Sequence, residues 1–432
     1  MPYAIDLFCG AGGCSEGLLQ AGFHILFSSD ISEMAEVTYR NRHEQLGLLQ
    51  GENTWFERAD VKELSGEKIK SSIAGLKMFD GKTIPEIDLM IGGPSCQGFS
   101  RAGRRDSSDP RNMLFGEYVR IINEMKPKYV VLENVEGFKD MQFFGYVGLN
   151  GTKYDDGSVT PDLLTNELTE IGYEVLPYRI LNAADYGVPQ RRNRIIFIGY
   201  RKGLRAPSYP KPTHTPENYV TVKDAIADLS KKAQESESDY AESSKAGRTP
   251  NMNGFTIKAD KIENTETSAS NETVTERFSL FRDGETGTQL RKRLFSEGID
   301  VSDCPNLLEL CGRKTGKPKE IIEEAIKSGN ADAETADVLL TKKHMRTKLS
   351  PYEPSPTIMT CADDYVNPWE NRPLTVREMA RLQSFDDSFV FLGKRTTGGS
   401  RRRFEIPQQT QVGNAVPPLL AKAVAEEIKK VL

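Results

Sequence analysis

A cysteine stands directly after a buried apolar run in this chain. Pro94-Ser95-Cys96-Gln97 follows the strand predicted by Ile87-Asp88-Leu89-Met90-Ile91. A thiolate is a strong nucleophile, and parallel sheets hold their reactive groups where the strands end. The acid of Glu133-Asn134-Val135 follows a second apolar run, and Gln190-Arg191-Arg192-Asn193-Arg194 precedes a third. The sequence therefore predicts a nucleophile, an acid and cations that meet in one cleft.

A glycine-rich turn lies between the first predicted strand and the first predicted helix. Asp6-Leu7-Phe8-Cys9-Gly10-Ala11-Gly12-Gly13 contains three glycines, which let a ligand approach the backbone and the N-terminus of the helix. Asp30 ends the next strand, where an acid can bind both hydroxyls of a ribose. The turn lacks the G-x-G-x-x-G spacing, so a ligand carboxylate fits it as well as a pyrophosphate does. Together the two features predict an adenosine-containing ligand, and a turn chosen for packing alone is the alternative.

These groups need a sheet to position them, and residues 1 to about 200 supply its pattern. Short apolar runs alternate with helical patterns, which predicts βαβ units and a doubly wound parallel sheet. The helix after the first strand is expected to start near Gly13 and to end before Gly22. The predicted strands are Tyr3 to Phe8, His24 to Ser29, Ile87 to Ile91, Tyr129 to Leu132, Glu174 to Ile180 and Arg194 to Tyr200.

The character of the chain changes after Tyr200, where four prolines crowd a short span and the βαβ rhythm stops. We expect residues 1–203 to form one domain and residues 204–371 a second, smaller and loop-rich domain. Residues 372–404 are expected to form a hinge segment with a helix over Arg372 to Phe385. Residues 405–432 then return to the first domain, with a last helix over Leu419 to Leu432 that packs on the sheet.

Composition describes an ordinary globular protein of 432 residues with a net charge of −5. It has no apolar run near the length of about 18 residues that a membrane span requires, and the N-terminus enters a strand without a signal-peptide pattern. We therefore expect a cytoplasmic protein. Its six cysteines lack the paired spacing of a zinc site or of a disulfide framework, so reduced thiols and no metal are expected.

Five motifs occur in the order found in DNA (cytosine-5)-methyltransferases. They are Phe8-Cys9-Gly10-Ala11-Gly12-Gly13, Pro94-Ser95-Cys96-Gln97, Glu133-Asn134-Val135, Gln190-Arg191-Arg192-Asn193-Arg194 and Gln411-Val412-Gly413-Asn414-Ala415-Val416. The chain resembles this family, in its bacterial restriction-modification type. The resemblance implies an α/β fold with a Rossmann-like S-adenosylmethionine-dependent methyltransferase sheet. It also implies that residues 204–371 are a target recognition domain.

The resemblance further implies methyl transfer from S-adenosyl-L-methionine to C5 of cytosine in a specific double-stranded DNA sequence. Cys96 would attack C6 and so push electron density to C5. Glu133, held protonated, would share a proton with N3. Arg194 would hold the O2 edge, and Arg192 would support phosphate or loop closure. Loss of the C5 proton would then expel Cys96.

By the same resemblance, Phe8 and Ile31 would lie on the two faces of the adenine, and Asp30 would bind the ribose. Leu114 would close the pocket. The cofactor residues implied are Phe8, Gly10, Ala11, Gly12, Gly13, Asp30, Ile31, Asp60, Val61, Pro94, Leu114, Asn414 and Ala415. Asp60 would accept from the adenine amino group, and Asn414 with Ala415 would meet the methionine end. Two positions depart from the family pattern: Ser95 replaces the usual proline, and Ala415 stands where many members carry serine.

The segment from Ser95 to Arg111 has the composition of a loop that closes over DNA. Its expected DNA-contacting residues are Ser100, Arg101, Arg104 and Arg105, and the target base would have to rotate out of the duplex to reach the cleft. The recognition sequence depends on side chains between about 205 and 370 that enter the major groove. The candidates there are Arg282, Gln289, Arg291 and Arg293.

Three alternatives belong to other classes. A branch that resembles this family methylates tRNA, but it usually carries a Cys-Phe-Thr segment, and Thr396-Thr397-Gly398-Gly399-Ser400 stands at that place here. An inactive DNA-binding relative would often lack the thiol or the acid, both of which are present. A nicotinamide oxidoreductase is disfavoured by the glycine spacing. DNA is therefore the expected partner of a monomer, with a cognate restriction endonuclease for the same site as a candidate partner.

Overall fold

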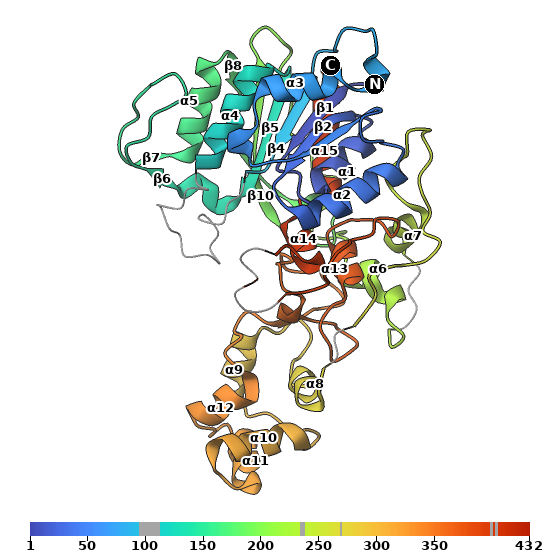
Figure 1. The fold of residues 1–432 in the computed structure, drawn as a ribbon. Coiled ribbons are helices and arrows are strands. Elements are labelled where there is room, and N and C mark those ends of the chain that lie inside the picture. Colours follow the sequence, from blue (N-terminus) through green and yellow to red (C-terminus); the bar gives the residue numbers. More distant parts are fainter. Residues whose placement is uncertain (95–112, 234–237, 268–269, 398–400, 402–404) are drawn as a thin grey trace.

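The protein is described here from a computed structural model that covers residues 1–432, except 95–112, 234–237, 268–269, 398–400 and 402–404 (Figure 1). A large upper lobe holds a sheet with helices on both faces, and a narrow lower lobe holds short helices. The two chain ends lie close together at the top of the upper lobe. No helix among the described residues has the length and apolar character to cross a membrane.

The central sheet of the described residues has eight strands in the order β3-β2-β1-β4-β5-β10-β8, with β9 paired to β10. Neighbouring strands from β3 to β5 are parallel, which places the carboxyl ends of β1, β2, β4 and β5 along one edge. The strands are β1 (Tyr3–Leu7), β2 (His24–Asp30), β3 (Trp55–Arg58), β4 (Leu89–Gly92), β5 (Tyr129–Val135), β8 (Tyr173–Val175), β9 (Arg179–Asn182) and β10 (Asn193–Arg201).

The expectation of a wholly parallel sheet is wrong at one edge, where β10 runs antiparallel to β5, β8 and β9. The chain passes from β9 to β10 through a short connection without a helical crossover, and such a connection joins antiparallel strands. The predicted strand Glu174 to Ile180 is divided into β8 and β9, and β3 was missed. Trp55-Phe56-Glu57-Arg58 is too short and too charged to show the apolar run of a buried strand.

The helices of the upper lobe are placed by their apolar faces. In α4 (Leu114–Met125), Phe115, Tyr118, Val119 and Ile122 have helical spacing and are buried with one face of the sheet. The same core contains α3 (Gly66–Ala74) and α5 (Thr160–Glu170), whereas α1 (Gly13–Gln20) and α15 (Pro418–Lys429) cover the opposite face. The predicted first and last helices are therefore confirmed, and the last one does pack on the sheet.

A third apolar core, which we call the hinge core, joins the lobes. It unites α6 (Val222–Ile226), α13 (Val376–Leu382) and α14 (Gln408–Asn414). Ala11 of the glycine-rich turn belongs to this hinge core. A separate core holds the lower lobe together. Its helices are α8 (Glu272–Ser279), α9 (Gly287–Ser296), α10 (Pro305–Thr315), α11 (Lys319–Lys327) and α12 (Ala333–Leu340).

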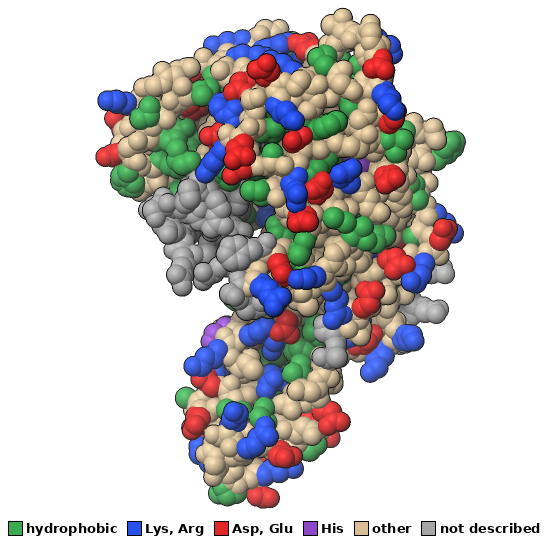
Figure 2. Space-filling model, viewed as in Figure 1, with side chains coloured by type: hydrophobic (Ala, Val, Ile, Leu, Met, Phe, Trp, Pro, Cys, Tyr) green, Lys and Arg blue, Asp and Glu red, His purple; other side chains and the backbone are tan. Residues whose placement is uncertain are grey.

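Smaller elements complete the described chain. The remaining helices are α2 (Glu33–Gln45) and α7 (Asp239–Ala246), and the short 3-10 helices are η1 (Val61–Glu63), η2 (Lys77–Phe79), η4 (Glu136–Asp140), η5 (Ala183–Tyr186), η6 (Ala227–Leu229) and η7 (Ala362–Asp364). Two short ribbons pair β6 (Gln142–Phe143) with β7 (Ser158–Val159), and β11 (Thr347–Lys348) with β12 (Tyr365–Val366). On the face shown in Figure 2, basic and acidic side chains are interspersed over both lobes.

Candidate active site

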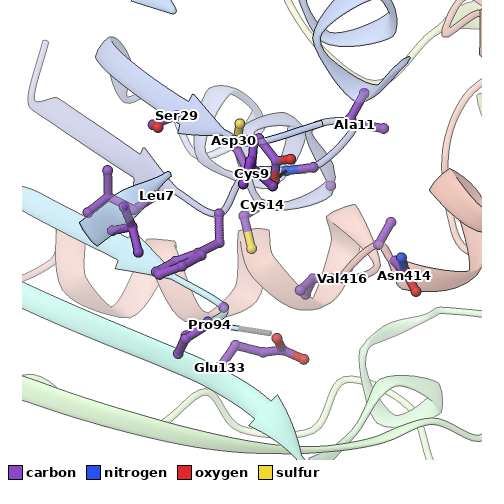
Figure 3. Close-up of a pocket in the computed structure, with 18 of the residues that line it drawn as sticks. Leu7, Cys9, Ala11, Cys14, Ser29, Asp30, Pro94, Glu133, Asn414 and Val416 are labelled. Carbon is purple, nitrogen blue, oxygen red and sulfur yellow. Dashed lines mark hydrogen bonds between the residues drawn. The ribbon is translucent and has the colours of Figure 1, made fainter. Parts of the chain in front are cut away.

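A cavity of about 420 Å³ opens at the carboxyl ends of β1, β2, β4 and β5. Figure 3 shows that its walls come from the glycine-rich turn, the end of β5 and the turn after α14. The predicted site residues that line it are Phe8, Gly10, Ala11, Gly13, Asp30, Ile31, Asp60, Val61, Pro94, Leu114, Glu133, Arg194, Asn414 and Ala415. Segments from both ends of the chain therefore meet at one site.

The glycine-rich turn has an unusual backbone. Phe8 has a φ of 58°, and Gly10 and Gly12 also have positive φ, at 53° and 105°. A non-glycine residue with positive φ is strained, and such strain gathers at ligand sites. Asp30 holds the turn in place, since its Oδ2 accepts from the Gly10 amide at 2.9 Å. Gly12 does not line the cavity: it precedes α1, and a Cβ there would lie 3.1 Å from the Tyr39 ring, so its predicted cofactor contact stays a prediction.

Two buried acids stand beside this turn. Burial raises the pKa of Asp30, although the amides of Ser32 and Gly10 donate to its carboxylate. Burial raises the pKa of Asp6 to about 7, against a 2.6 Å hydrogen bond from Ser15 Oγ. The Ile31 amide also stabilises the Asp30 carboxylate. A carboxylate has about four lone-pair sites, so Asp30 can still accept from a ligand hydroxyl.

The start of α1 touches the turn that follows α14. A Cβ on Gly13 would lie 2.2 Å from the Val416 carbonyl oxygen and 3.2 Å from the Ala415 Cβ. Only glycine allows this approach. The contact places Asn414 and Ala415 beside the N-terminus of the helix, where both line the cavity.

Apolar and polar groups complete the other side of the cavity. The Ile31 side chain lines it although 66% of the residue is exposed, as expected for a face that a flat ligand ring covers. Asp60 caps η1, and its Oδ1 accepts from the Lys62 amide at 3.0 Å. Val61 and Leu114 line the cavity next to it. The part of the cavity in which we expect the adenine is therefore lined by apolar side chains, with one carboxylate at its edge.

Glu133 and Arg194 form an ion pair at the inner end of the cavity. Arg194 Nε lies 2.7 Å from Glu133 Oε1, and both side chains are about nine-tenths buried. Burial raises the pKa of Glu133, and the attraction of Arg194 and Arg192 only partly opposes it. The carboxyl is therefore held closer to its protonated form than an exposed glutamate, as the proposed proton sharing requires.

The strand ends that carry this pair are fixed by neighbouring hydrogen bonds. Asn134 Nδ2 donates to the Pro94 carbonyl at 3.0 Å, which ties the end of β5 to the segment after β4. Tyr118 Oη donates to the Met90 and Val131 carbonyls at 3.0 and 2.9 Å. The position of Pro94, two residues before Cys96, is thereby set against Glu133.

Arg192 has a different place from the one expected. It does not line the cavity, and its Nη atoms donate to the carbonyls of Ile358, Gly413 and Ala415 at 3.0, 2.9 and 3.1 Å. The residue is 2% exposed. It precedes the first residue of β10, so strand geometry does not direct it to the face that Arg194 occupies. The described contacts of Arg192 hold the wall of the cavity, and its role in phosphate contact or loop closure stays a prediction.

Several predicted residues lie outside the part of the chain that the structure describes. They are Cys96 and the DNA-loop residues Ser100, Arg101, Arg104 and Arg105. Other residues were missed. Cys9 and Cys14 are both buried, and both also line the cavity. Their place directly around Gly10 to Gly13 was the available signal.

Three of the base-reading candidates are already engaged within the lower lobe. Arg291 Nη1 lies 2.8 Å from Asp337 Oδ1. Gln289 closes a capping box with Thr286 at the start of α9. Arg293 makes two 2.8 Å bonds to Glu285 and one 2.7 Å bond to the Leu280 carbonyl. Arg282 lies 3.6 Å from Glu297 in an exposed ion pair, and its side chain is 67% exposed.

Comparison with known proteins decides the family. The sequence model of C-5 cytosine-specific DNA methylases matches residues 3–430. The chain belongs to this family. It is therefore a DNA cytosine-5 methyltransferase that uses S-adenosyl-L-methionine as its methyl donor.

Individual relatives of the methyltransferase match over nearly its whole length. Type II methyltransferase M1.HphI of Haemophilus parahaemolyticus is 34% identical over 431 residues, covering 99% of this chain and 86% of that protein. Type II methyltransferase M.DdeI of Desulfomicrobium norvegicum is 29% identical over 429 residues, covering 98% and 88%. A solved E. coli structure, described as a prophage-encoded DNA modification methyltransferase, has a TM-score of 0.63 at 22% identity and covers 100% of this chain and 99% of that one. This likeness confirms the fold class.

The cavity of the methyltransferase fits S-adenosyl-L-methionine. Phe8 and Ile31 line it with apolar side chains that would suit an adenine, and Asp30 lines it with a carboxylate that would suit the hydroxyls of a ribose. The backbone of the strained turn is open at Gly10, where a Cβ would meet nothing within 4 Å. The cavity is thus lined by a carboxylate, backbone groups and apolar side chains. This lining suits a ligand that has a nucleoside at one end and an amino acid at the other.

Proposed function

We propose that this methyltransferase acts on C5 of cytosine within a specific double-stranded DNA sequence, through covalent attack of Cys96 on C6 of a base rotated out of the duplex. The observation that carries the proposal is the buried pair of Glu133 and Arg194 at 2.7 Å in the same cavity as Asp30. The pair stands beside Pro94, which Asn134 holds two residues before the cysteine.

The chemistry needs a nucleophile because C5 of cytosine reacts poorly by itself. The Cys96 thiolate forms a bond to C6, and the ring electrons move to C5 and N3. S-adenosyl-L-methionine supplies a methyl group on a sulfonium, which departs as a neutral thioether. Glu133 shares its proton with N3 and so stabilises the charge that develops there, while Arg194 holds Glu133 and faces the O2 edge.

The reaction closes by elimination. Water takes the C5 proton, the C6–S bond breaks, and its electrons return to sulfur, so the thiolate is regenerated. Access to the cavity requires the target nucleotide to leave the base stack, since a base within the duplex is shielded on both faces. We propose that Ser100, Arg101, Arg104 and Arg105 contact the DNA around the vacated position.

We further propose that residues 204–371 hold the target recognition domain, that the enzyme acts as a monomer, and that a restriction endonuclease cuts the same site. Two observations support this setting: the relatives are named type II methyltransferases, and the lower lobe has its own core and an exposed Arg282. A lobe with a separate core can present side chains to the major groove without disturbing the catalytic sheet.

Methyl transfer tests the proposal directly. Tritiated S-adenosyl-L-methionine is incubated with unmethylated genomic DNA and either the wild type or Cys96→Ala, and 5-methylcytosine is then mapped at base resolution. We expect label at one short recurring sequence with the wild type and none with the variant. Label with Cys96→Ala would refute covalent catalysis, and label scattered over all cytosines would refute specificity. Transfer to tRNA in competition with DNA would redirect the proposal to RNA.

The loop residues have their own test. The triple variant Arg101→Ala, Arg104→Ala and Arg105→Ala should methylate slowly and show a weaker dependence of DNA affinity on salt, because fewer phosphate contacts release fewer counterions. Unchanged rates and an unchanged salt dependence would remove these residues from the DNA interface.

A further inference from the structure

Three buried side chains connect the lower part of the molecule to the wall of the cofactor cavity. They are Gln190, Arg192 and Gln383, and we call them the polar clasp. Gln190 and Gln383 are 0% exposed and Arg192 is 2% exposed. We propose that the polar clasp positions the Asn414–Ala415 wall of the cavity and couples cofactor binding to DNA binding.

Arg192 and Gln383 of the polar clasp hydrogen-bond the wall of the cavity. Arg192 Nη2 donates to the carbonyls of Gly413 and Ala415, and Gln383 Nε2 donates to the Val412 carbonyl at 2.8 Å and to the Ala415 carbonyl at 3.4 Å. Ala415 thus receives two donors on one oxygen while its side chain lines the cavity. Hydrogen bonds of this kind fix a backbone segment that has no regular partner strand.

Gln190 and Arg192 of the polar clasp hydrogen-bond Ile358, in the segment that leads to the lower lobe. Gln190 Oε1 accepts from the Ile358 amide at 2.8 Å, and Arg192 Nη1 donates to the Ile358 carbonyl at 3.0 Å. Gln190 Nε2 also donates to Gln383 Oε1 at 2.9 Å, which closes the clasp. Both peptide groups of Ile358 are therefore held by members of the polar clasp, and Arg192 bonds Ile358 and the cavity wall alike.

The cavity wall and the segment around Ile358 also touch each other directly. A Cβ on Gly413 would lie 2.4 Å from the Met359 carbonyl oxygen, so glycine is required where the cavity wall meets residue 359. From there the chain is continuous with the lower lobe through Ser355, which exchanges backbone bonds with Pro189 and Arg191 at 3.0 and 2.8 Å. A shift of the segment 355–359 must therefore move the carbonyls that border the cavity.

The consequence is a coupling free energy between the binding of DNA and the binding of the cofactor. If bound DNA holds the lower lobe in one position, the clasp holds the cavity wall in the matching position. DNA then changes the affinity for the cofactor by the same factor by which the cofactor changes the affinity for DNA. The shared hinge core supports this direction of coupling, because Ala11, Val412 and Ile358 pack in it together. The DNA part of this inference rests on the proposed function, and the cofactor part does not.

The first test measures cofactor affinity without DNA. Calorimetry of S-adenosyl-L-methionine binding compares the wild type, Arg192→Lys and the matched control Arg191→Gln, whose parent arginine is exposed and pairs with Glu353. Lysine cannot span three carbonyls, so we expect the Kd of Arg192→Lys to rise about tenfold or more and that of the control to stay within twofold. At saturating cofactor and DNA, kcat should stay within about threefold while KM for the cofactor rises. An unchanged Kd, or an equal rise in the control, overturns the positioning role.

The second test measures coupling and does not depend on the folding of Arg192→Lys. The Kd of S-adenosylhomocysteine is measured with and without a duplex that carries the methylated sequence, in the wild type and in Gln383→Met. Methionine fills the same space but donates no hydrogen bond, so the factor by which DNA changes this Kd should fall towards one. No DNA effect in the wild type, or an equal effect in both proteins, overturns the coupling. If no methylated sequence exists, the proposed function fails, and the cofactor test still decides the role of Arg192.

Discussion

Replacing Glu133 by glutamine separates the contact that this side chain makes with Arg194 from its ability to transfer a proton. Glutamine keeps the size and the oxygen that faces Arg194 Nε at 2.7 Å, but it cannot transfer a proton. It retains an N–H that can donate to N3 of the base, so binding of the base is preserved while proton sharing is lost. We expect kcat to fall by about 10²-fold or more, which is about 3 kcal/mol of transition-state stabilisation.

The same variant has an effect on stability with a definite sign. Burial raises the pKa of Glu133, so the folded protein holds this proton more tightly than the unfolded chain does. Its contribution to the free energy of unfolding is therefore present at acid pH and is lost as the pH rises through the raised pKa. Glutamine does not titrate. The difference in free energy of unfolding should move in favour of Glu133→Gln as pH rises, by about 1.4 kcal/mol for each unit by which the pKa is raised.

Two assays check this reasoning. Urea unfolding of wild type and variant between pH 4.5 and 8 gives the stability difference, in which other titrating groups such as Asp6 cancel. Single-turnover methyl transfer at saturating cofactor gives the chemical rate. Glu174→Gln is the control, because its parent carboxylate bonds Tyr200 Oη outside the cavity. A rate within threefold of the wild type would refute the role of Glu133 in proton sharing, and a stability difference independent of pH would refute the raised pKa.

Three further predictions concern the cofactor wall and the lower lobe. Gly13→Ala should lower the melting temperature, because its Cβ would lie 2.2 Å from the Val416 carbonyl oxygen. It should also weaken S-adenosyl-L-methionine binding at least about tenfold by calorimetry. Unchanged binding would show that the Asn414–Ala415 wall of the cavity is not needed for the cofactor. If Asp30 binds the ribose, cofactor affinity should fall as the pH drops through its raised pKa, because the carboxylate then becomes protonated. Asp30→Asn should bind the cofactor weakly, and its affinity should not depend on this titration when binding is followed by fluorescence against pH. Arg293→Ala should destabilise the lower lobe by about 3 kcal/mol in hydrogen exchange, since it breaks a nearly buried pair, whereas Arg282→Ala should leave exchange unchanged and weaken DNA binding.

The sequence predicted the parts of the site that depend on local chain geometry. The turn from Phe8 to Gly13 lies between β1 and α1 as expected, because three glycines between an apolar run and a helical pattern allow little else. Asp30 and Glu133 stand at strand ends, and parallel strands bring such ends to one edge. Motif order then supplied the long-range link to Asn414, which no local pattern contains.

Other features could not be predicted because they depend on contacts between distant segments. The antiparallel direction of β10 follows from a connection whose length shows only once β9 is recognised as a strand. The bonds of Gln289 and Arg293 depend on Glu285 and Thr286, which a count of basic residues ignores. Composition locates a lobe that can contact DNA, but the internal bonds of each side chain decide whether it is available for base contact.

Arg192 and Arg194 show how far a short motif can be trusted. The resemblance implied an active-site role for both, with Arg194 at the O2 edge of the base and Arg192 in support of phosphate contact or loop closure. β10 begins at Asn193, however, and the Arg192 carbonyl accepts from the Ala183 amide at 2.9 Å while its side chain turns to Ile358 and Gly413. Arg194 thus contacts Glu133, and Arg192 contacts the Gly413 and Ala415 carbonyls at the wall of the cavity. A motif that joins these two contacts within three residues ties the alignment of Glu133 to the position of the lobe that we propose for DNA recognition.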